Sequence, residues 1–370
     1  MKSGGFWDGL FTFFGITIGA GIFGIPYVIS QAGFGLGLVY LLLLGIVMTF
    51  ISLYTGEVLL RTQQKHQLTG LAALYLGSWA KWLMFSAVTF SIYGALFAYI
   101  LGAGVAITSL FSISPFLSGL LFFVCFSLLL LGRRHFFAAA EGILNPVKLF
   151  ILFTLSVVAL FHFHPVPLSV HLSAWFAPFG VILFSYIGVS ALPEIAFELQ
   201  NKKSLKKVIL FGMLGTFFFY LLYSLGILGI TAAPQELTVL SLDGVLGTAT
   251  PWIAGVFTLL AMGSAYLALG FALKETYYLD LKLSSFASWL VVICVPLLLL
   301  FFGVQSFVKV LEISGVLGGG IMLLLLLLIH HTAVGKRTPE FTVSRSVLLK
   351  LLIALILITG IVVELISLIF

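Results

Sequence analysis

Long apolar segments follow one another along most of the chain and are separated by short polar stretches. About 20 consecutive apolar residues suffice for one helical membrane crossing, so the pattern predicts about eleven transmembrane helices. No polar stretch is long enough to fold outside a membrane, which predicts a single all-α, polytopic transmembrane domain over residues 1–370. The predicted spans lie near residues 9–30, 35–60, 82–111, 116–132, 142–163, 174–199, 206–231, 248–275, 284–302, 306–330 and 346–369.

The basic residues of the predicted loops all fall in alternate loops, and the remaining loops contain no Lys or Arg. Cytoplasmic loops are enriched in Lys and Arg, so we expect the N-terminus in the cytoplasm and, after eleven spans, Phe370 outside. This topology predicts a multi-pass protein of the cytoplasmic (inner) membrane. The basic loop residues are Arg61, Lys65, Lys81, Arg133, Arg134, Lys202, Lys203, Lys206, Lys207, Lys274, Lys282, Lys336, Arg337 and Arg345.

The loop between the second and third spans is semi-polar over residues 68–82, with Trp79 and Trp82 near its end. Such a segment is typical of a short helix that lies along the membrane interface. An ordinary loop is the alternative.

The composition agrees with a membrane protein. Hydrophobic residues make up 61% of the chain and charged residues only 8%, where a soluble domain carries about a quarter charged residues. The net charge of +6 reflects the basic residues of the loops and does not indicate a nucleic-acid partner. No span carries a His-Glu-x-x-His motif or a nucleophile with its base, so an enzyme is not expected. We expect no cofactor and no metal site, and as partners the bilayer and a small-molecule substrate, with no obligate protein partner.

The first predicted span is rich in residues that interrupt a helix. It contains Gly15, Gly19, Gly21 and Gly24, followed by Pro26. Each glycine costs about 1 kcal/mol relative to alanine in a helix, and proline removes a backbone donor. Close helix packing explains Gly15 and Gly19, but not the three helix breakers that follow so soon. We therefore expect the helix to unwind around Gly19 to Gly21, where protein or a water-filled cavity must surround the freed backbone.

The sixth predicted span carries a similar interruption, because Gly188 precedes Pro193 by five residues, as Gly21 precedes Pro26. Two interrupted spans set five spans apart are typical of an inverted repeat of five plus five helices, with the substrate between the interruptions. The freed amides at the start of a second half-helix favour a carboxylate. Repeat one is predicted over about 9–163, repeat two over about 174–330, and an extra span over about 346–369.

Two segments resemble a known superfamily. Residues 19–27, Gly-Ala-Gly-Ile-Phe-Gly-Ile-Pro-Tyr, resemble the first-span signature of the amino acid/polyamine/organocation superfamily, and residues 184–189 resemble its sixth span. Residues 191–207 are similar to the amino acid/auxin permease branch, of which the bacterial aromatic and hydroxy amino acid permeases are close relatives. The resemblance implies a LeuT-like fold with broken helices 1 and 6, alternating access, and an amino acid held between these two spans.

The resemblance also implies a set of substrate-binding residues. It places the substrate carboxylate at backbone amides of the first break, and the amino group at backbone carbonyls of the second. Tyr93 of the third span is expected to line the side-chain pocket, and Tyr99 is a further candidate. The implied binding residues are Thr17, Gly19, Ala20, Gly21, Ile22, Tyr93, Phe184, Ser185, Tyr186, Ile187 and Gly188.

Coupling to an ion is expected to involve Lys148 on the fifth span. Sodium-coupled relatives place two hydroxyls on the eighth span, where this chain has only Ser264, and some sodium-independent relatives place a fifth-span lysine there. The resemblance therefore implies H+ coupling or sodium independence, with Na+ as the alternative. A lysine among spans costs on the order of 3 kcal/mol, so an inward-facing one usually has a function. The alternative is that Lys148 snorkels to the interface.

Acidic residues in or near the spans are further candidates for proton transfer. Glu194 and Glu312 are the preferred relay residues. The alternative for Glu312 is a structural ion pair with Lys309, three residues before it on the same helix. Glu57 stands at a helix end beside basic residues, which predicts a structural role. His330 is expected to have no acidic neighbour.

Together these features predict a secondary active transporter that moves a neutral amino acid, aromatic or aliphatic, by alternating access. The substrate is expected to be neutral because basic-substrate members of the superfamily can carry an acid where this chain has Ser190. A sodium-coupled symporter, a channel lined by broken helices and a carrier of another substrate class with the same fold are the alternatives.

Overall fold

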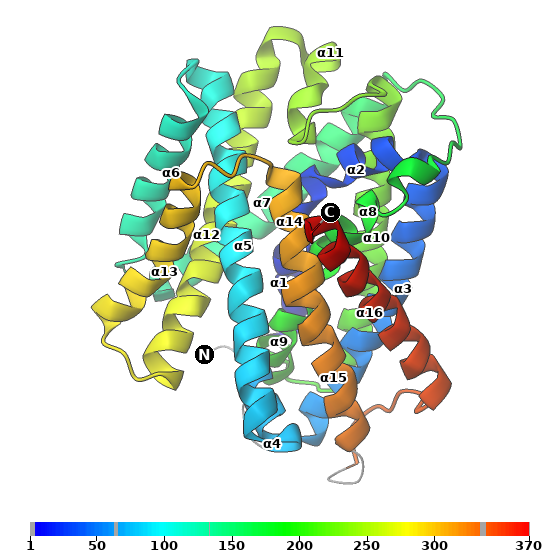
Figure 1. The fold of residues 1–370 in the computed structure, drawn as a ribbon, viewed down its shortest axis with the longest axis vertical. Coiled ribbons are helices and arrows are strands. Elements are labelled where there is room, and N and C mark those ends of the chain that lie inside the picture. Colours follow the sequence, from blue (N-terminus) through cyan, green and yellow to red (C-terminus); the bar gives the residue numbers. More distant parts are fainter. Residues whose placement is uncertain (1–3, 63–65, 133, 334–337, 370) are drawn as a thin grey trace.

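A computed structural model describes residues 4–62, 66–132, 134–333 and 338–369. Every regular element within these ranges is a helix, and the long helices stand side by side (Figure 1). Within the described residues, seven helices are long and apolar enough to cross a membrane, the first span is a bent pair, and three shorter apolar helices complete the set. The predicted loop residues Lys65, Arg133, Lys336 and Arg337 lie outside the described ranges.

The helical segments correspond to the eleven predicted spans. Their ends differ from the predicted ones by a few residues, except that the fifth begins at Arg134 instead of residue 142. The spans are α1 and α2 (Phe6–Thr17 and Ile25–Ala32), α3 (Phe34–Arg61), α5 (Ser78–Phe111), α6 (Pro115–Leu129), α7 (Arg134–Leu160), α8 and α9 (Ala177–Tyr186 and Leu192–Glu198), α10 (Ser204–Ile230), α12 (Thr250–Asp280), α13 (Ser285–Phe301), α14 and α15 (Phe307–Ile313 and Gly320–Thr332) and α16 (Val347–Ile369).

The short helix predicted between the second and third spans is α4, Leu68–Leu76. It ends at Gly77, whose φ of 91° lies in a region that glycine occupies without steric cost. Because α5 begins at the next residue, Trp79 and Trp82 belong to the third span and not to the short helix. Figure 1 places α4 at one end of the molecule and α11, Asp243–Leu246, at the other, as expected of loops on opposite sides of a membrane.

Elements of the two predicted repeats pair in space. Helix α3 packs along α10, α5 along α12, and α6 against α13, which joins the second span to the seventh, the third to the eighth and the fourth to the ninth. With 34 and 31 residues, α5 and α12 are the longest helices and make the most extensive contact. The two halves of the chain thus interlock around the first and sixth spans.

The first span breaks between α1 and a 3₁₀ turn, η1 (Ala20–Phe23). Ile18 has φ −87° and ψ 71°, and Gly19 has φ −100° and ψ −149°; neither pair is helical. The two halves are bent by 50°. Pro26 is the second residue of α2, in the first turn, where a helix does not need the missing donor. The glycines therefore accompany the break, and the proline begins the second half-helix.

The sixth span breaks in a similar way at Ile187, where φ is −71° and ψ is 78°. The amide of Gly188 donates to the carbonyl two residues earlier at 2.7 Å, which is the hydrogen bond of an inverse γ-turn. A 3₁₀ turn, η3 (Val189–Ala191), and α9 follow, and Pro193 again stands second in its half-helix. The two interruptions share one order of elements: a break, a 3₁₀ turn and a proline-started helix.

The tenth span is interrupted by a π-helical turn, η6 (Ser314–Gly319), between α14 and α15. A Cβ atom added at Gly315 would lie 2.6 Å from the Gly180 carbonyl oxygen of α8, and one at Gly318 would lie 2.9 Å from the Ala87 carbonyl oxygen of α5. Only glycine permits such close backbone contacts. The π turn, a geometry that is frequent at functional sites, therefore wedges between the sixth and third spans.

Candidate functional site

The two breaks pack directly against each other through small residues. A Cβ atom at Gly21 would lie 2.9 Å from Cβ of Ser185, and one at Gly188 would lie 3.3 Å from Cβ of Thr17. In both cases the hydroxyl oxygen of the facing residue is closer still. Each break therefore contributes a glycine that accommodates a hydroxyl residue of the other break. The structure brings these four predicted site residues together in one reciprocal contact.

Tyr220 of α10 joins the two breaks by hydrogen bonds. Its hydroxyl lies 2.8 Å from the carbonyl oxygen of Thr17 and 2.6 Å from that of Ser185. These carbonyls stand at the C-terminal ends of α1 and α8, where a helix leaves its last carbonyls unpaired and carries partial negative charge. Tyr220 is fully buried, and its hydroxyl, which carries a single hydrogen, is a donor within reach of both carbonyls. The sequence pattern did not indicate Tyr220, because a tyrosine in an apolar span has no distinguishing spacing.

A second tyrosine of α10 supports the other side of the first break. The hydroxyl of Thr238, in the 3₁₀ turn η4 (Thr238–Leu242), donates to the Phe23 carbonyl at 2.6 Å. The hydroxyl of Tyr223 lies 2.9 Å from that of Thr238. Because residues three apart share one face of a helix, Tyr220 and Tyr223 approach the first span together.

Two further residues of the first break, Ala20 and Ile22, are buried, with exposed fractions of only 2% and 1%. The amides at the start of this second half-helix lack intrahelical acceptors and carry the positive end of its dipole. Beside the second break, the Tyr186 hydroxyl donates to the Leu41 carbonyl at 3.2 Å, which fixes the end of α8 to α3.

The third-span tyrosine at the first break is Tyr99 and not Tyr93. The Tyr93 hydroxyl lies 2.9 Å from the Tyr277 hydroxyl on α12 and 2.9 Å from the Val291 carbonyl on α13, away from the breaks. A Cβ atom at Gly19 would lie 3.6 Å from the Tyr99 hydroxyl. Six residues on an α-helix are separated by about 120° around its axis, so the two tyrosines face different neighbours.

The residues on either side of the second break pack on the π turn. A Cβ atom at Gly315 would lie 2.7 Å from Cβ of Phe184, and one at Gly319 would lie 3.6 Å from Cγ1 of Ile187. The glycine cluster of the tenth span therefore lets its backbone reach the sixth span beside the break.

A cavity lies beside the first break, between α1, α7 and α12. Ile18 and Gly19 line it from the break, and Asn145 and Lys148 line it from α7. The Lys148 ammonium donates to the Ser264 hydroxyl of α12 at 3.0 Å, so the side chain points inward and does not reach for the interface. A cation is favoured here, because the C-terminal end of α1 carries partial negative charge.

Glu194 takes a different position from the other residues predicted for ion coupling. It is the third residue of α9, where the helix dipole favours a carboxylate. It is not among the residues that line the cavity with Lys148.

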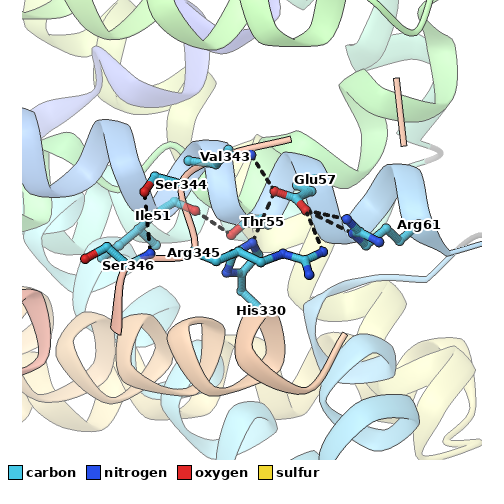
Figure 2. Close-up of polar contacts among 9 residues, drawn as sticks. All are labelled: Ile51, Thr55, Glu57, Arg61, His330, Val343, Ser344, Arg345 and Ser346. Carbon is cyan, nitrogen blue, oxygen red and sulfur yellow. Dashed lines mark hydrogen bonds and ion pairs between the residues drawn. The ribbon is translucent and has the colours of Figure 1, made fainter. Parts of the chain in front are cut away.

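A second polar centre surrounds Glu57 at the end of α3 (Figure 2). Glu57 is fully buried; Oε1 accepts from Arg61 Nη2 at 2.7 Å, and Oε2 accepts from the Val343 amide at 2.7 Å. His330 Nε2 lies 3.2 Å from Oε2, and Arg345 Nη2 lies 3.9 Å from Oε1. The expectation that His330 lacks an acidic neighbour is wrong, because α15 packs beside α3. Glu57 thus ties α3, α15 and the segment before α16 together.

Comparison with known proteins finds a family model, a relative and a solved structure that the chain resembles. A family model described as the tryptophan/tyrosine permease family matches residues 2–367. The chain is 27% identical to tyrosine-specific transport system 1 of Haemophilus influenzae over 285 residues. This matched stretch covers 70% of each protein. The crystal structure of MhsT in complex with L-phenylalanine matches with a TM-score of 0.67 over 98% of this chain and 97% of MhsT, at 15% identity. The likeness confirms the predicted all-α, LeuT-like membrane fold.

Gly21→Ala is expected to push the two breaks apart, because the new methyl group would clash with the side chain of Ser185. We predict that it weakens amino acid binding at least about tenfold, or about 1.4 kcal/mol, while the protein stays folded. Binding of a radiolabelled amino acid to the purified protein measures this. Gly119→Ala is the matched control, because a Cβ atom there would meet no atom closer than 3.4 Å. Unchanged affinity of the Gly21 variant would place the site elsewhere.

Tyr220→Phe is expected to leave two buried carbonyls without their shared donor, at about 1–3 kcal/mol. Tyr266→Phe is the control, because Tyr266 is also buried and its hydroxyl lies 2.9 Å from the Ser127 hydroxyl, far from the breaks in the chain. Both variants should unfold at a lower temperature, but only Tyr220→Phe should weaken amino acid binding, by about tenfold. Equal affinities of the two variants would assign Tyr220 a purely structural role.

Proposed function

The chain belongs to the tryptophan/tyrosine permease family, and from this premise we propose that it carries a neutral aromatic amino acid by alternating access. It is an amino acid transporter and not an enzyme. The aromatic class is supported by the tyrosine-specific system of H. influenzae and by the L-phenylalanine held by MhsT. Ser190, where an acid can accompany a basic substrate, supports a neutral one.

The observation that carries this proposal is the junction of the two breaks. An amino acid is a zwitterion, and its carboxylate and ammonium groups need partners of opposite charge a few ångströms apart. The start of η1 offers amides at a positive helix end, and the end of α8 offers carbonyls at a negative one. The contacts of Gly21 with Ser185 and of Gly188 with Thr17 hold these two ends together.

The same junction supports a hinge. Helix α2 packs on α8, and α1 packs on α9, so the four half-helices form two pairs on either side of the breaks. Each pair can tilt against the α5–α12 scaffold while the breaks absorb the change in backbone angles. Opening one pair at a time exposes the substrate to one side of the membrane.

Coupling is proposed to run through protons, with Lys148 in the role that a sodium ion has in other transporters of this fold. Lys148 lines the cavity beside the first break, and its ammonium group contacts Ser264 of α12. There it stabilises the negative end of α1, and loss of its proton would remove this interaction. The alternating basic loops support a cytoplasmic (inner) membrane location with the N-terminus in the cytoplasm.

Uptake into proteoliposomes tests the proposed function. We expect saturable uptake of labelled tyrosine, tryptophan or phenylalanine, competed by neutral amino acids and not by lysine or glutamate. An inward proton gradient should raise accumulation, and a sodium gradient at constant pH should not. Absence of saturable uptake of any amino acid would contradict the proposal, and so would currents far above carrier turnover, which indicate a channel.

Lys148→Met tests the coupling residue. Because it removes the ammonium group from the cavity, we expect accumulation driven by a proton gradient to fall at least about tenfold. The exposed Lys206 offers a matched control, and Lys206→Met should accumulate substrate as the unmodified protein does. Proton-driven accumulation that survives in the Lys148 variant would exclude this lysine from coupling.

A further inference from the structure

Three charged residues meet where the start of the tenth span lies beside the eleventh span. They are remote from Lys148 in the chain. Nζ of Lys309 lies 3.1 Å from Oε2 of Glu312 on the same helix, α14, and 3.2 Å from Oε1 of Glu364 on α16. One ammonium group therefore bridges two carboxyl groups of different helices. The pairing of Lys309 with Glu312 follows from their spacing, but Glu364 joins them only in the fold.

The charges of this group do not balance. With both carboxyl groups ionised, one positive and two negative charges leave a net charge of −1. Glu364 is fully buried and Glu312 is 13% exposed, whereas Lys309 is 41% exposed. Among the described residues, Oε2 of Glu364 has no hydrogen-bond partner. A buried carboxylate oxygen without a partner is costly, and one added proton would remove the excess charge.

Among the described residues of α5, α8, the π turn and α16, no other side chain beside this group supplies the missing positive charge. Helix α15, which also packs on α16, carries only His330 and His331, in its last turn. Helices α8 and α5 and the π turn pack on α14; α8 and the π turn contain no charged residue, and α5 contains only Lys81, near its opposite end. The other charged residue of α16 is Lys350, in its first turns. Glu236, which accepts from the Val308 amide at 3.2 Å, adds further negative charge beside α14.

We propose that Glu312 and Glu364 share one bound proton, and that this proton links the tenth and eleventh spans to the movement of the sixth. Lys309 already contacts one oxygen of each carboxyl group, and the unpartnered Oε2 of Glu364 is the atom left to hold the proton. Glu364 is about 8 Å along the helix from the end of α16, at 1.5 Å per residue, and the exposed Lys309 marks the side from which the proton enters.

Glu312 also touches the sixth span. A Cβ atom at Gly180 would lie 2.6 Å from Cγ of Glu312 and 2.9 Å from its Cα. Gly180 stands on α8, whose far end is the second break, and Glu312 stands just before the π turn that packs on this break. Protonation brings the net charge of Lys309, Glu312 and Glu364 to zero and tightens the packing of Glu312 on α8. Loss of the proton restores a net charge of −1, which favours opening to water. The coupling role rests on the proposed function, but the proton site itself does not.

Infrared spectroscopy of the purified protein detects the bound proton directly, as the carbonyl stretching band of a protonated carboxylic acid that titrates with pH. We expect this band in the unmodified protein and its loss in both Glu364→Gln and Glu312→Gln. Asp243→Asn, which changes an exposed acid of the α11 end, should keep it. A band that remains in both glutamine variants overturns the proposal, and so does a band that responds to sodium at constant pH.

Transport assays then test the coupling. In the unmodified protein, uptake should fall about tenfold for each pH unit above the midpoint of the pair, the slope of a single proton. Glu364→Gln mimics the protonated acid, so it should retain exchange of internal for external substrate within about twofold and lose at least about nine-tenths of accumulation. Accumulation with an unaltered pH profile in this variant overturns the coupling. If no amino acid is transported at all, the proposed function fails while the infrared result still decides the proton site.

Discussion

A helix that breaks inside a membrane frees backbone groups that lipid cannot satisfy, and the whole arrangement around the first and sixth spans meets this constraint. The carbonyls at the ends of α1 and α8 share the hydroxyl of Tyr220, and the carbonyl of Phe23 accepts from Thr238. Both donors belong to the second half of the chain, on α10 and on the turn that follows it. The broken helices are therefore stable only inside a bundle that already surrounds them.

This requirement explains why each break carries a glycine that faces a hydroxyl residue of the other break. Thr17 and Ser185 each donate to the carbonyl four residues earlier, at 2.8 and 2.7 Å, which keeps their hydroxyls turned along their own helices. The glycine of the opposite break then approaches each of them closely. The proposed binding site uses the same stretch of backbone, namely the amides at the start of η1 and the carbonyls at the end of α8.

The sequence predicts the spans and the two breaks well, because hydropathy and the Gly and Pro positions are local signals. It assigns Pro26 and Pro193 to the interruptions, whereas both stand in the first turn of the helix that follows. Tyr220 and Glu364 could not be singled out, because their roles depend on contacts between helices distant in the chain. The same holds for His330, which meets Glu57 across 273 positions, and for Tyr99, whose neighbours depend on how α5 is rotated about its axis.

The proposed transport mechanism requires that the two breaks together hold the amino acid. The most direct measurement is an experimental structure of the protein with a bound aromatic amino acid. We expect the substrate carboxylate within hydrogen-bond distance, about 2.7–3.2 Å, of the amides between Gly19 and Ile22, with its ammonium group facing the carbonyls at the end of α8. A substrate bound between other helices, with the junction of Gly21, Ser185 and Tyr220 unchanged and unoccupied, would contradict it.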